Sequence, residues 1–266
     1  MRAAVGAAEM EHRIMKIVVI GGTGLIGSQV VGHLTARGHD VIAASPDSGV
    51  NAITGEGLTE TLAGAQTVID VSNSPSFADD DVMAFFRTGT TNLLQAARAA
   101  GVSHFVALSI VGSEHLAASG YMRAKVEQER LIRAGGVPFT IVHATQFLEF
   151  LVGIADSGTV DGVVRVPQAN IQPVAAADVA LAVADAAERE PADGIVEIAG
   201  PEVFTFADIV GRRLAARHDD RTVIADPAGI YFGENLTGDE LLAGADAPRG
   251  SVTYEQWIAL PGNAER

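Results

Sequence analysis

Three side chains suited to proton transfer lie close together in the middle of the chain. Ser109 ends an apolar run, Tyr121 follows twelve residues later, and Lys125 is four residues further on. If 120–134 is a helix, Tyr121 and Lys125 share one face of it, because residues at i and i+4 are neighbours. A nearby ammonium favours the phenolate, so we expect Lys125 to lower the pKa of Tyr121. The spacing predicts a tyrosine that exchanges a proton with a substrate carbonyl, which Ser109 would orient.

A glycine-rich turn near the start of the chain predicts a dinucleotide-binding site. Gly21, Gly24 and Gly27 recur at three-residue spacing, after the apolar run 16–20 and before the amphipathic stretch 25–37. Glycine permits the sharp turn between strand and helix and lets a pyrophosphate approach the backbone. The free N–H groups of the first helical turn then hold the phosphates. The predicted contacts are Gly21, Thr23, Gly24, Leu25, Ile26 and Gly27, and Lys125 is expected to bind the ribose hydroxyls.

Strand-like and helix-like segments alternate through the first half of the chain. The expected strands are 16–20, 40–44, 67–71, 104–109 and 138–143, and the expected helices are 25–37, 58–63, 81–100 and 120–134. This alternation is typical of a parallel sheet with helices on both faces. We therefore predict an α/β fold with a Rossmann-type, doubly wound parallel sheet.

The regular alternation of strand-like and helix-like segments ends after residue 144. We divide the chain into an N-terminal extension (1–14), a dinucleotide-binding core (15–144) and a C-terminal part (145–266). The last part is expected to contain a hairpin at 158–166, helices at 176–188 and 205–216, and a strand at 194–198 that returns to the core. These pieces are short, so we expect a small substrate lobe over the carboxyl edge of the sheet without a separate core. The predicted anchors of the tail are Tyr231, Phe232, Tyr254 and Trp257.

Composition excludes several functions. The net charge of −15 over 266 residues disfavours nucleic acid as a partner. The absence of cysteine excludes thiol nucleophiles and cysteine metal sites and favours the cytoplasm, and the scattered histidines predict no metal. The first residues resemble neither a signal peptide nor a membrane anchor, and no membrane partner is expected. Both a monomer and a homodimer fit the sequence.

The end of the second expected strand bears on cofactor choice. An acidic residue at this place binds a free ribose 2′-hydroxyl, whereas an arginine accommodates a 2′-phosphate. Ser45 and Ser48 are able to hydrogen-bond a phosphate, while Asp47 repels one if it points inward. Ser45 is the predicted contact. Three residues that close the third strand are predicted to line the adenine and ribose side of the cofactor: Val71, Ser72 and Asn73.

Several motifs together resemble a known family. They are GGTGLIG (21–27), GTTNLL (89–94), GVSHFVALS (101–109), YMRAK (121–125), HATQF (143–147) and the segment 172–178. On these motifs, residues 15 to about 210 resemble the atypical, NmrA-like NAD(P)H-binding branch of the short-chain dehydrogenase/reductase superfamily. This branch includes quinone, imine, dye and carbonyl reductases, as well as members that only sense the nucleotide.

The resemblance implies roles for individual residues. Tyr121 would be the general acid, Lys125 would hold the ribose, and Ser109 would bind the substrate carbonyl. His143 and Ala144 would line the cofactor site, and the family's preference favours NADPH over NADH as the donor. One departure is Phe86, which stands where catalytically complete members carry an asparagine of the proton relay.

The loops above the nicotinamide predict an apolar substrate pocket. Its expected residues are Phe77, His115, Thr145, Gln146, Phe147 and Phe150. Such a pocket favours a small apolar carbonyl, enone or quinone over a charged sugar nucleotide. The leading hypothesis is an NAD(P)H-dependent reductase. The alternatives are a non-catalytic NAD(P) sensor and, third, a sugar-nucleotide epimerase or dehydratase.

Overall fold

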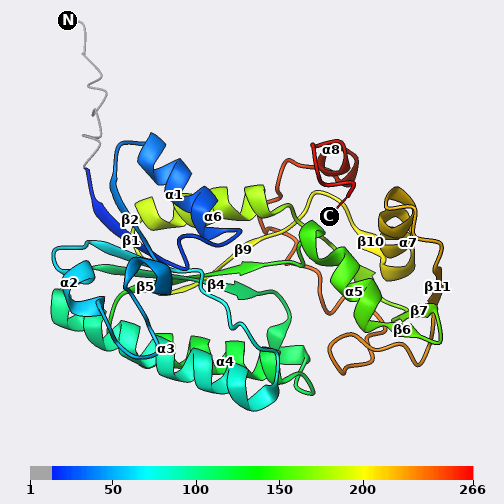
Figure 1. Cartoon of the computed structure of the whole chain (residues 1–266), viewed down its shortest axis with the longest axis horizontal. Coiled ribbons are helices and arrows are strands. Elements are labelled where there is room, and N and C mark those ends of the chain that lie inside the picture. Colours follow the sequence, from blue (N-terminus) through cyan, green and yellow to red (C-terminus); the bar gives the residue numbers. More distant parts are fainter. Residues whose placement is uncertain (1–13, 266) are drawn as a thin grey trace, which may run out of the picture.

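A six-stranded parallel sheet forms the centre of the molecule (Figure 1). The computed structural model describes residues 14–265, so residues 1–13 of the expected extension lie outside the described part. The strand order is β2-β1-β3-β4-β5-β9. The strands are β1 (Lys16–Ile20), β2 (Asp40–Ala44), β3 (Thr67–Asp70), β4 (His104–Ile110), β5 (Phe139–Ala144) and β9 (Gly194–Ile198).

Helices cover both faces of this sheet, as Figure 1 shows. On one face lie α1 (Gly27–Ala36) and α6 (Ala176–Glu188), which pack on Ile17 and Val19 of β1. The other face packs against α2 (Leu58–Leu62), α3 (Asp79–Ala100) and α4 (Gly120–Ala134), and receives Val18 and Ile20. Side chains alternate between the faces along a strand, so β1 is buried on both sides. The predicted doubly wound Rossmann-type fold is confirmed.

The carboxyl ends of the strands meet at one edge of the sheet. Parallel pairing places Ile20 beside Ala44 and Asp70. Further along the sheet, Ser109 of β4 is paired in register with His143 of β5. The glycine turn after β1 and the polar residues of β3, β4 and β5 are therefore brought to the same edge, where ligands of open α/β sheets bind.

The C-terminal part adds short elements beyond this edge. They are η3 (Leu148–Phe150), α5 (Leu151–Ser157), β6 (Thr159–Val160), β7 (Val163–Val166), β8 (Asn170–Ile171), β10 (Phe204–Thr205), α7 (Phe206–Ala216), β11 (Thr222–Ala225) and α8 (Tyr254–Ile258). Two small sheets result, β11-β7-β6 and β10-β8. The predicted hairpin is present as β6 and β7, with a turn at Asp161 and Gly162, both at positive φ. The sequence did not predict β8, β10 and β11, which are only two to four residues long.

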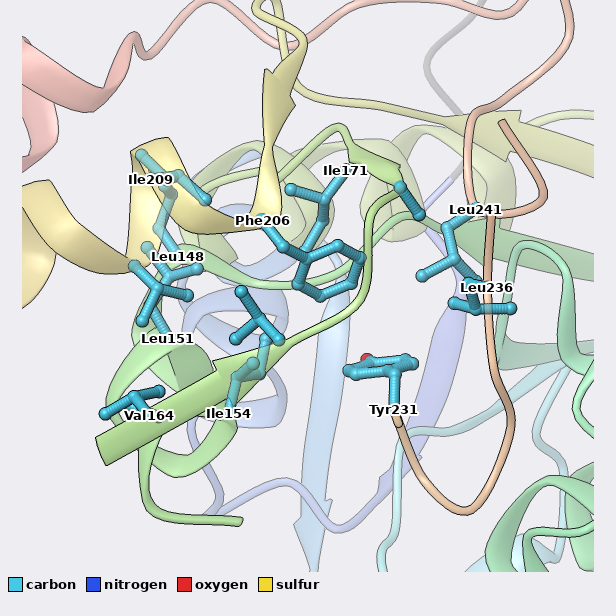
Figure 2. Close-up of a cluster of buried hydrophobic side chains, with 14 of the residues drawn as sticks. Leu148, Leu151, Ile154, Val164, Ile171, Phe206, Ile209, Tyr231, Leu236 and Leu241 are labelled. Carbon is cyan, nitrogen blue, oxygen red and sulfur yellow. The ribbon is translucent and has the colours of Figure 1, made fainter. Parts of the chain in front are cut away.

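The apolar side chains of this lobe do not form a core separate from the rest of the molecule. They belong to one buried cluster that includes Leu151, Phe206 and Tyr231 (Figure 2), together with Leu116 and Met122 from before residue 145. Segments far apart in the sequence meet in this cluster, so no single segment reveals the whole of it. Residues 145–265 thus build a lobe whose apolar side chains pack together and against the start of α4.

Three of the four predicted tail anchors are buried in this cluster. Tyr231, Tyr254 and Trp257 are at most 5% exposed, whereas Phe232 is 44% exposed and is not a member of the cluster. The indole of Trp257 donates to Glu149 at 2.9 Å, which ties α8 to the start of the lobe. Within residues 14–265, no helix is long and apolar enough to cross a membrane.

Candidate active site

Backbone contacts of the glycine turn leave no room for side chains. Gly21 has a φ of +77°, and a Cβ there would lie 2.9 Å from the backbone of Ser72. A Cβ on Gly27 would lie 2.1 Å from the carbonyl oxygen of Gly21. A Cβ on Gly24 would meet the same oxygen at 3.3 Å. The turn is thus drawn tightly under the start of α1, and only glycine fits at its centre.

Unused N–H groups line the outer side of this turn. The N–H groups of Gly21 and Gly22 donate to Ala44, but within the described residues those of Thr23 and Leu25 donate to no other backbone group. Both residues are exposed, at the amino end of α1. Free N–H groups together with the positive end of a helix dipole suit a phosphate. The turn therefore fits the pyrophosphate of a dinucleotide.

The end of β2 carries a further unpaired polar atom. Ser45 is 5% exposed, and its hydroxyl has no hydrogen-bond partner in the described residues. Its own N–H donates to Ser48 Oγ at 2.9 Å within the short helix η1 (Pro46–Ser48). Asp47 is exposed beside it. A buried hydroxyl without a partner fits a ribose oxygen, since burying it unpaired is unfavourable.

Tyr121 stands at the first turn of α4, beside the residues that follow β3. Ser119 caps this helix by accepting from the N–H of Met122. The phenol donates to Asn73 Oδ1 at 3.0 Å. Its ring lies between the rings of Phe77 and Phe86, at centroid distances of 5.6 and 5.9 Å. Asn73 follows Ser72, whose backbone contacts Gly21, so the phenol lies next to the glycine turn.

The expected effect of Lys125 on Tyr121 is wrong for this geometry. Burial raises the pKa of Tyr121 to about 12, and no contact in the described residues joins its hydroxyl to the Lys125 ammonium. Lys125 Nζ instead donates to the carbonyl of Leu108 at 2.8 Å and to Gln128, and lies 4.5 Å from the ring centre of Phe86. Although Tyr121 and Lys125 share a helix face, the longer lysine side chain turns down toward the sheet.

A buried polar network continues from Lys125 to β3. Gln128 donates to Asp70 Oδ2 at 3.0 Å, and the Ser72 hydroxyl donates to Asp70 Oδ1 at 2.6 Å. Burial lowers the pKa of Lys125 to about 8, although the negative charges of Asp70 and Glu129 act to raise it. Burial also raises the pKa of Asp70, opposed by Ser72 and Lys125. Ser72, a predicted cofactor contact, is thus part of the support beneath the site.

Ser109 and His143 belong to a second buried cluster centred on Glu129 of α4. The Ser109 hydroxyl donates to Glu129 Oε1 at 2.6 Å, and His143 Nε2 lies 2.7 Å from the same oxygen. Arg133 donates to the other oxygen at 3.0 Å. Burial alone would raise the pKa of Glu129, but these partners lower it to about 2.

This arrangement corrects two predicted roles. Ser109 is 2% exposed and its hydroxyl is bound to a carboxylate, so the structure does not place it against a substrate carbonyl. His143 is 6% exposed and faces Glu129 rather than the cofactor site. Both residues point to the α4 side of the sheet because they occupy one register pair of β4 and β5. Ala144 points to the opposite face and is buried among α6 side chains.

The predicted substrate residues divide into two groups. Phe77, Phe150 and His115 are largely exposed, Phe77 in a loop and the other two at the ends of short 3-10 helices. Phe147 is half-buried, with its ring 5.4 Å from that of Phe150. Thr145 is 1% exposed and accepts from the N–H of Gly200 at 3.4 Å, away from these rings.

Gln146 differs from the other members of the predicted pocket. It is 6% exposed, and neither its amide nitrogen nor its amide oxygen has a partner among the described residues. A buried amide without partners fits a polar ligand group. The remaining predicted cofactor residue, Val71, is half-buried and donates its N–H to Ile20 beside the glycine turn.

Sequence reasoning missed the supporting residues Asp70, Gln128 and Glu129. A signal for each was present. Gln128 and Glu129 lie three and four residues after Lys125, on the helix face that also carries Tyr121. Asp70 ends an otherwise apolar strand, where a carboxylate requires partners.

Comparison with known proteins agrees with this geometry. The family model described as NAD(P)H-binding matches residues 21–190, from the glycine turn to the end of α6. The chain belongs to this NAD(P)H-binding family of atypical short-chain dehydrogenases/reductases. The family resemblance seen in the motifs is thereby confirmed.

Two curated relatives of the family differ in what they are named for. One is the (4-alkanoyl-5-oxo-2,5-dihydrofuran-3-yl)methyl phosphate reductase of Streptomyces griseus, 31% identical over 71% of this chain and 69% of the relative. Another is the photosystem II assembly factor Ycf39 of Cyanophora paradoxa, 30% identical over 52% of this chain and 48% of the relative. The family therefore holds a reductase and an assembly factor at similar distance from this chain.

Solved structures support the fold. A dTDP-4-dehydrorhamnose reductase from Clostridium acetobutylicum superposes with a TM-score of 0.67, covering 89% of this chain and 95% of that one. Its sequence identity is 16%, so the likeness concerns the fold alone.

Proposed function

We propose that this protein is an NAD(P)H-dependent reductase of small apolar carbonyl, enone or quinone compounds. The observation that carries the proposal is the position of the Tyr121 phenol. It packs against two aromatic rings and is held by Asn73, the residue after Ser72, whose backbone lies against Gly21 of the glycine turn. A bound reduced nicotinamide would supply hydride at this edge.

Tyr121 is suited to give a proton rather than to take one. Because its pKa is about 12, the phenol stays protonated at neutral pH. It is therefore able to protonate the oxygen of a carbonyl or enolate as negative charge develops there. Asn73 accepts the phenolic hydrogen in the absence of substrate and fixes the direction of the hydroxyl.

Lys125 affects the Tyr121 phenol indirectly, by fixing the position of α4. Its ammonium joins this helix to the Leu108 carbonyl of β4 and contacts Phe86, whose ring packs on Tyr121. Lys125 is thus a positioning residue for the phenol. The sequence expectation that it binds the cofactor ribose stays a prediction.

The apolar rings around Tyr121 support an apolar acceptor. Phe77, whose ring packs on Tyr121, is 63% exposed, and Phe150, whose ring packs on Phe147, is 53% exposed. Exposed aromatic surface at a site favours a flat ligand that covers it. The Streptomyces griseus relative is named for a phosphate ester of an alkanoyl dihydrofuranone, which shares the conjugated carbonyl group but also carries a charged phosphate.

NADPH is the donor that we propose, following the family's preference. Ser45 and Ser48 support it as hydrogen-bonding groups at the end of β2, while the exposed Asp47 is the residue that opposes it. The protein titrated with NADPH and NADH separately, by the fluorescence of the reduced nicotinamide, measures this preference.

The test of the reductase proposal is turnover by the purified protein. NADPH oxidation is followed with a panel of quinones, enones and ketones. We expect Tyr121→Phe to lower kcat by about 100-fold or more while NADPH affinity is unchanged, because one proton donor is removed. Wild-type turnover by a Tyr121→Phe, Lys125→Ala double variant would contradict the mechanism.

A second function, a non-catalytic NAD(P) sensor, is favoured by one observation. The Lys125 ammonium does not reach the Tyr121 phenol, and Phe86 fills the place between them. A sensor would bind the oxidised and reduced cofactors with different affinity and reduce none of the acceptors. Multiple turnover with any acceptor of the panel decides against it.

A further inference from the structure

A tight hairpin in the C-terminal segment brings a second tyrosine toward the site. Tyr231 and Glu234 exchange backbone hydrogen bonds of 2.8 and 3.1 Å. The two residues between them, Phe232 and Gly233, have φ angles of +47° and +88°. Such a turn favours asparagine or glycine at both places, and an aromatic residue there is strained by roughly 1 kcal/mol or more. The segment holds this strained turn in place.

Contacts with the residues before α4 fix the position of the hairpin. Glu234 accepts from the N–H of Ala118 at 2.6 Å. Gly233 passes so close that a Cβ on it would lie 3.3 Å from the Cβ of Ala118. Ala118 is three residues before Tyr121. The hairpin is therefore attached directly beside the first turn of the helix that carries the proposed acid.

The two tyrosines also share one hydrophobic cluster. Tyr231 is a buried member of this cluster, and the ring of Tyr121 packs against it. Burial raises the pKa of Tyr231, and the neighbouring Tyr121 raises it further. Both phenols thus stay protonated at neutral pH, in one apolar environment.

The ring of Tyr231 is fixed, but its hydroxyl is unused. Its centroid lies 5.2 Å from that of Phe206 and 4.7 Å from that of Phe232, which meets it edge-on. Figure 2 shows this ring facing Phe206 across the cluster. No described residue accepts from or donates to its hydroxyl, although the side chain is only 5% exposed.

The proposed reductase mechanism lacks a second hydrogen-bond donor to the substrate oxygen, and a phenol hydroxyl is able to fill this role. Ser109, the expected second donor to the substrate oxygen, is committed to Glu129. Resting on the proposed function, we propose that Tyr231 binds the substrate oxygen opposite Tyr121, so that two phenols hold one carbonyl or quinone oxygen. Tyr121 gives its proton, and Tyr231 keeps its own while its hydrogen bond to the oxygen shortens as negative charge develops.

The three tyrosines of the chain provide the experiment. Tyr231→Phe removes one hydroxyl and keeps the ring that packs on Phe206. Tyr254→Phe is the matched control, because the Tyr254 hydroxyl is buried without a partner in the same cluster. Each variant is assayed with NADPH and a benzoquinone for kcat/KM, for the dissociation constant of NADPH, and for the melting temperature.

We expect Tyr231→Phe to lower kcat/KM by about 10- to 100-fold, the loss of one hydrogen bond to a charged oxygen. NADPH affinity and melting temperature should stay at the wild-type values, and Tyr254→Phe should behave as the wild type. Equal kcat/KM in Tyr231→Phe and wild type would overturn the inference alone. So would a loss of activity that merely follows a loss of stability or of NADPH affinity, because that outcome marks a packing role.

A wild-type protein that reduces no acceptor would overturn the proposed function, and this inference with it. That outcome is distinct from an active wild type with an equally active Tyr231→Phe variant. The double variant Tyr121→Phe, Tyr231→Phe adds a further check. If both phenols hold one oxygen, the two losses are not additive, since removing the first leaves less charge for the second to stabilise.

Discussion

The glycine turn after β1 and the edge that carries Tyr121 are built in different ways. In the turn, backbone atoms make the site, and would-be Cβ atoms at Gly21 and Gly27 collide with backbone. At the Tyr121 edge, side chains make the site, and the position of each depends on its hydrogen-bond partner. Glu129 binds the Ser109 hydroxyl, and Gln128, which also binds Asp70, binds the Lys125 ammonium. Ser109 and Lys125 are thereby held away from the phenol. A site made by the backbone is fixed by its sequence motif, whereas a site made by side chains depends on the residues beneath it.

The largest effect is expected in the glycine turn. Gly27→Ala places a Cβ 2.1 Å from the Gly21 carbonyl, so the turn must open. We expect the free energy of unfolding to fall by roughly 2–3 kcal/mol and NADPH affinity to weaken at least about 100-fold. Gly32→Ala is the control in the same helix, because nothing lies within 4 Å of its Cβ. It should be neutral or stabilising, and an NADPH affinity equal in both variants would contradict a backbone-made site.

The next effect concerns the support beneath the side-chain site. Glu129→Gln leaves Ser109, His143 and Arg133 without their shared carboxylate, and we expect roughly 2–4 kcal/mol less stability at neutral pH. Because the folded-state pKa of Glu129 is about 2 against an ordinary 4.5, its contribution is fully present above about pH 5 and is lost as the pH falls toward 2.

Urea unfolding of wild type and Glu129→Gln between pH 7 and pH 3 measures this. The difference in the free energy of unfolding should shrink as the pH falls. A difference that does not change with pH would show that the carboxylate is not the centre of the cluster.

Cofactor choice should respond to a single residue at the end of β2. Asp47→Arg exchanges an exposed negative charge for a group that pairs with a 2′-phosphate. We expect the ratio of NADPH to NADH affinity to rise about tenfold. Asp161→Arg, on the distant turn between β6 and β7, makes the same charge change and should leave the ratio as it was. A ratio altered equally by both variants would point to overall charge instead of a local contact.

The smallest effect is expected for Ser109, whose predicted contact with the substrate the structure does not support. Ser109→Ala removes one buried hydrogen bond, so the free energy of unfolding should fall by about 1 kcal/mol. Since its hydroxyl is bound to Glu129, kcat with a quinone should stay within about threefold of the wild type. A loss of kcat comparable to that of Tyr121→Phe, in a stable variant, would show that Ser109 acts on the substrate and would contradict the supporting role inferred from its hydrogen bond to Glu129.

The sequence was sufficient for the fold and for the glycine turn. Apolar runs located the six strands of the sheet, of which the central ones are buried on both faces, and glycine spacing located the turn because no other residue fits there. The role of Ser109 was not predictable in this way. Its partner Glu129 is twenty residues distant in sequence, and the contact exists only once α4 packs on β4.

The packing of the C-terminal lobe was not predictable for a related reason. Phe206, Tyr231 and Trp257 come from elements far apart in the sequence, and the apolar pattern of one element does not show which others it meets. The sequence predicts that Tyr231 packs in the tail, and its contact with Phe206 agrees with this. The position of its hydroxyl depends on the hairpin that is bound beside Ala118, which only the folded structure shows. Contacts between distant segments carry this information, and local patterns do not.

The most direct test of the central claim follows one hydrogen atom. The protein is supplied with NADPH or NADH that carries deuterium on one face of C4, together with an enone or ketone that it turns over and that receives the hydride on carbon, and the reduced product is examined by mass spectrometry and NMR. The account predicts that one of the two C4 faces gives deuterium to the product in every turnover, at a rate that falls in Tyr121→Phe. Binding of the cofactor with no deuterium in any enone or ketone product and no cofactor oxidation by any quinone of the panel would contradict a reductase.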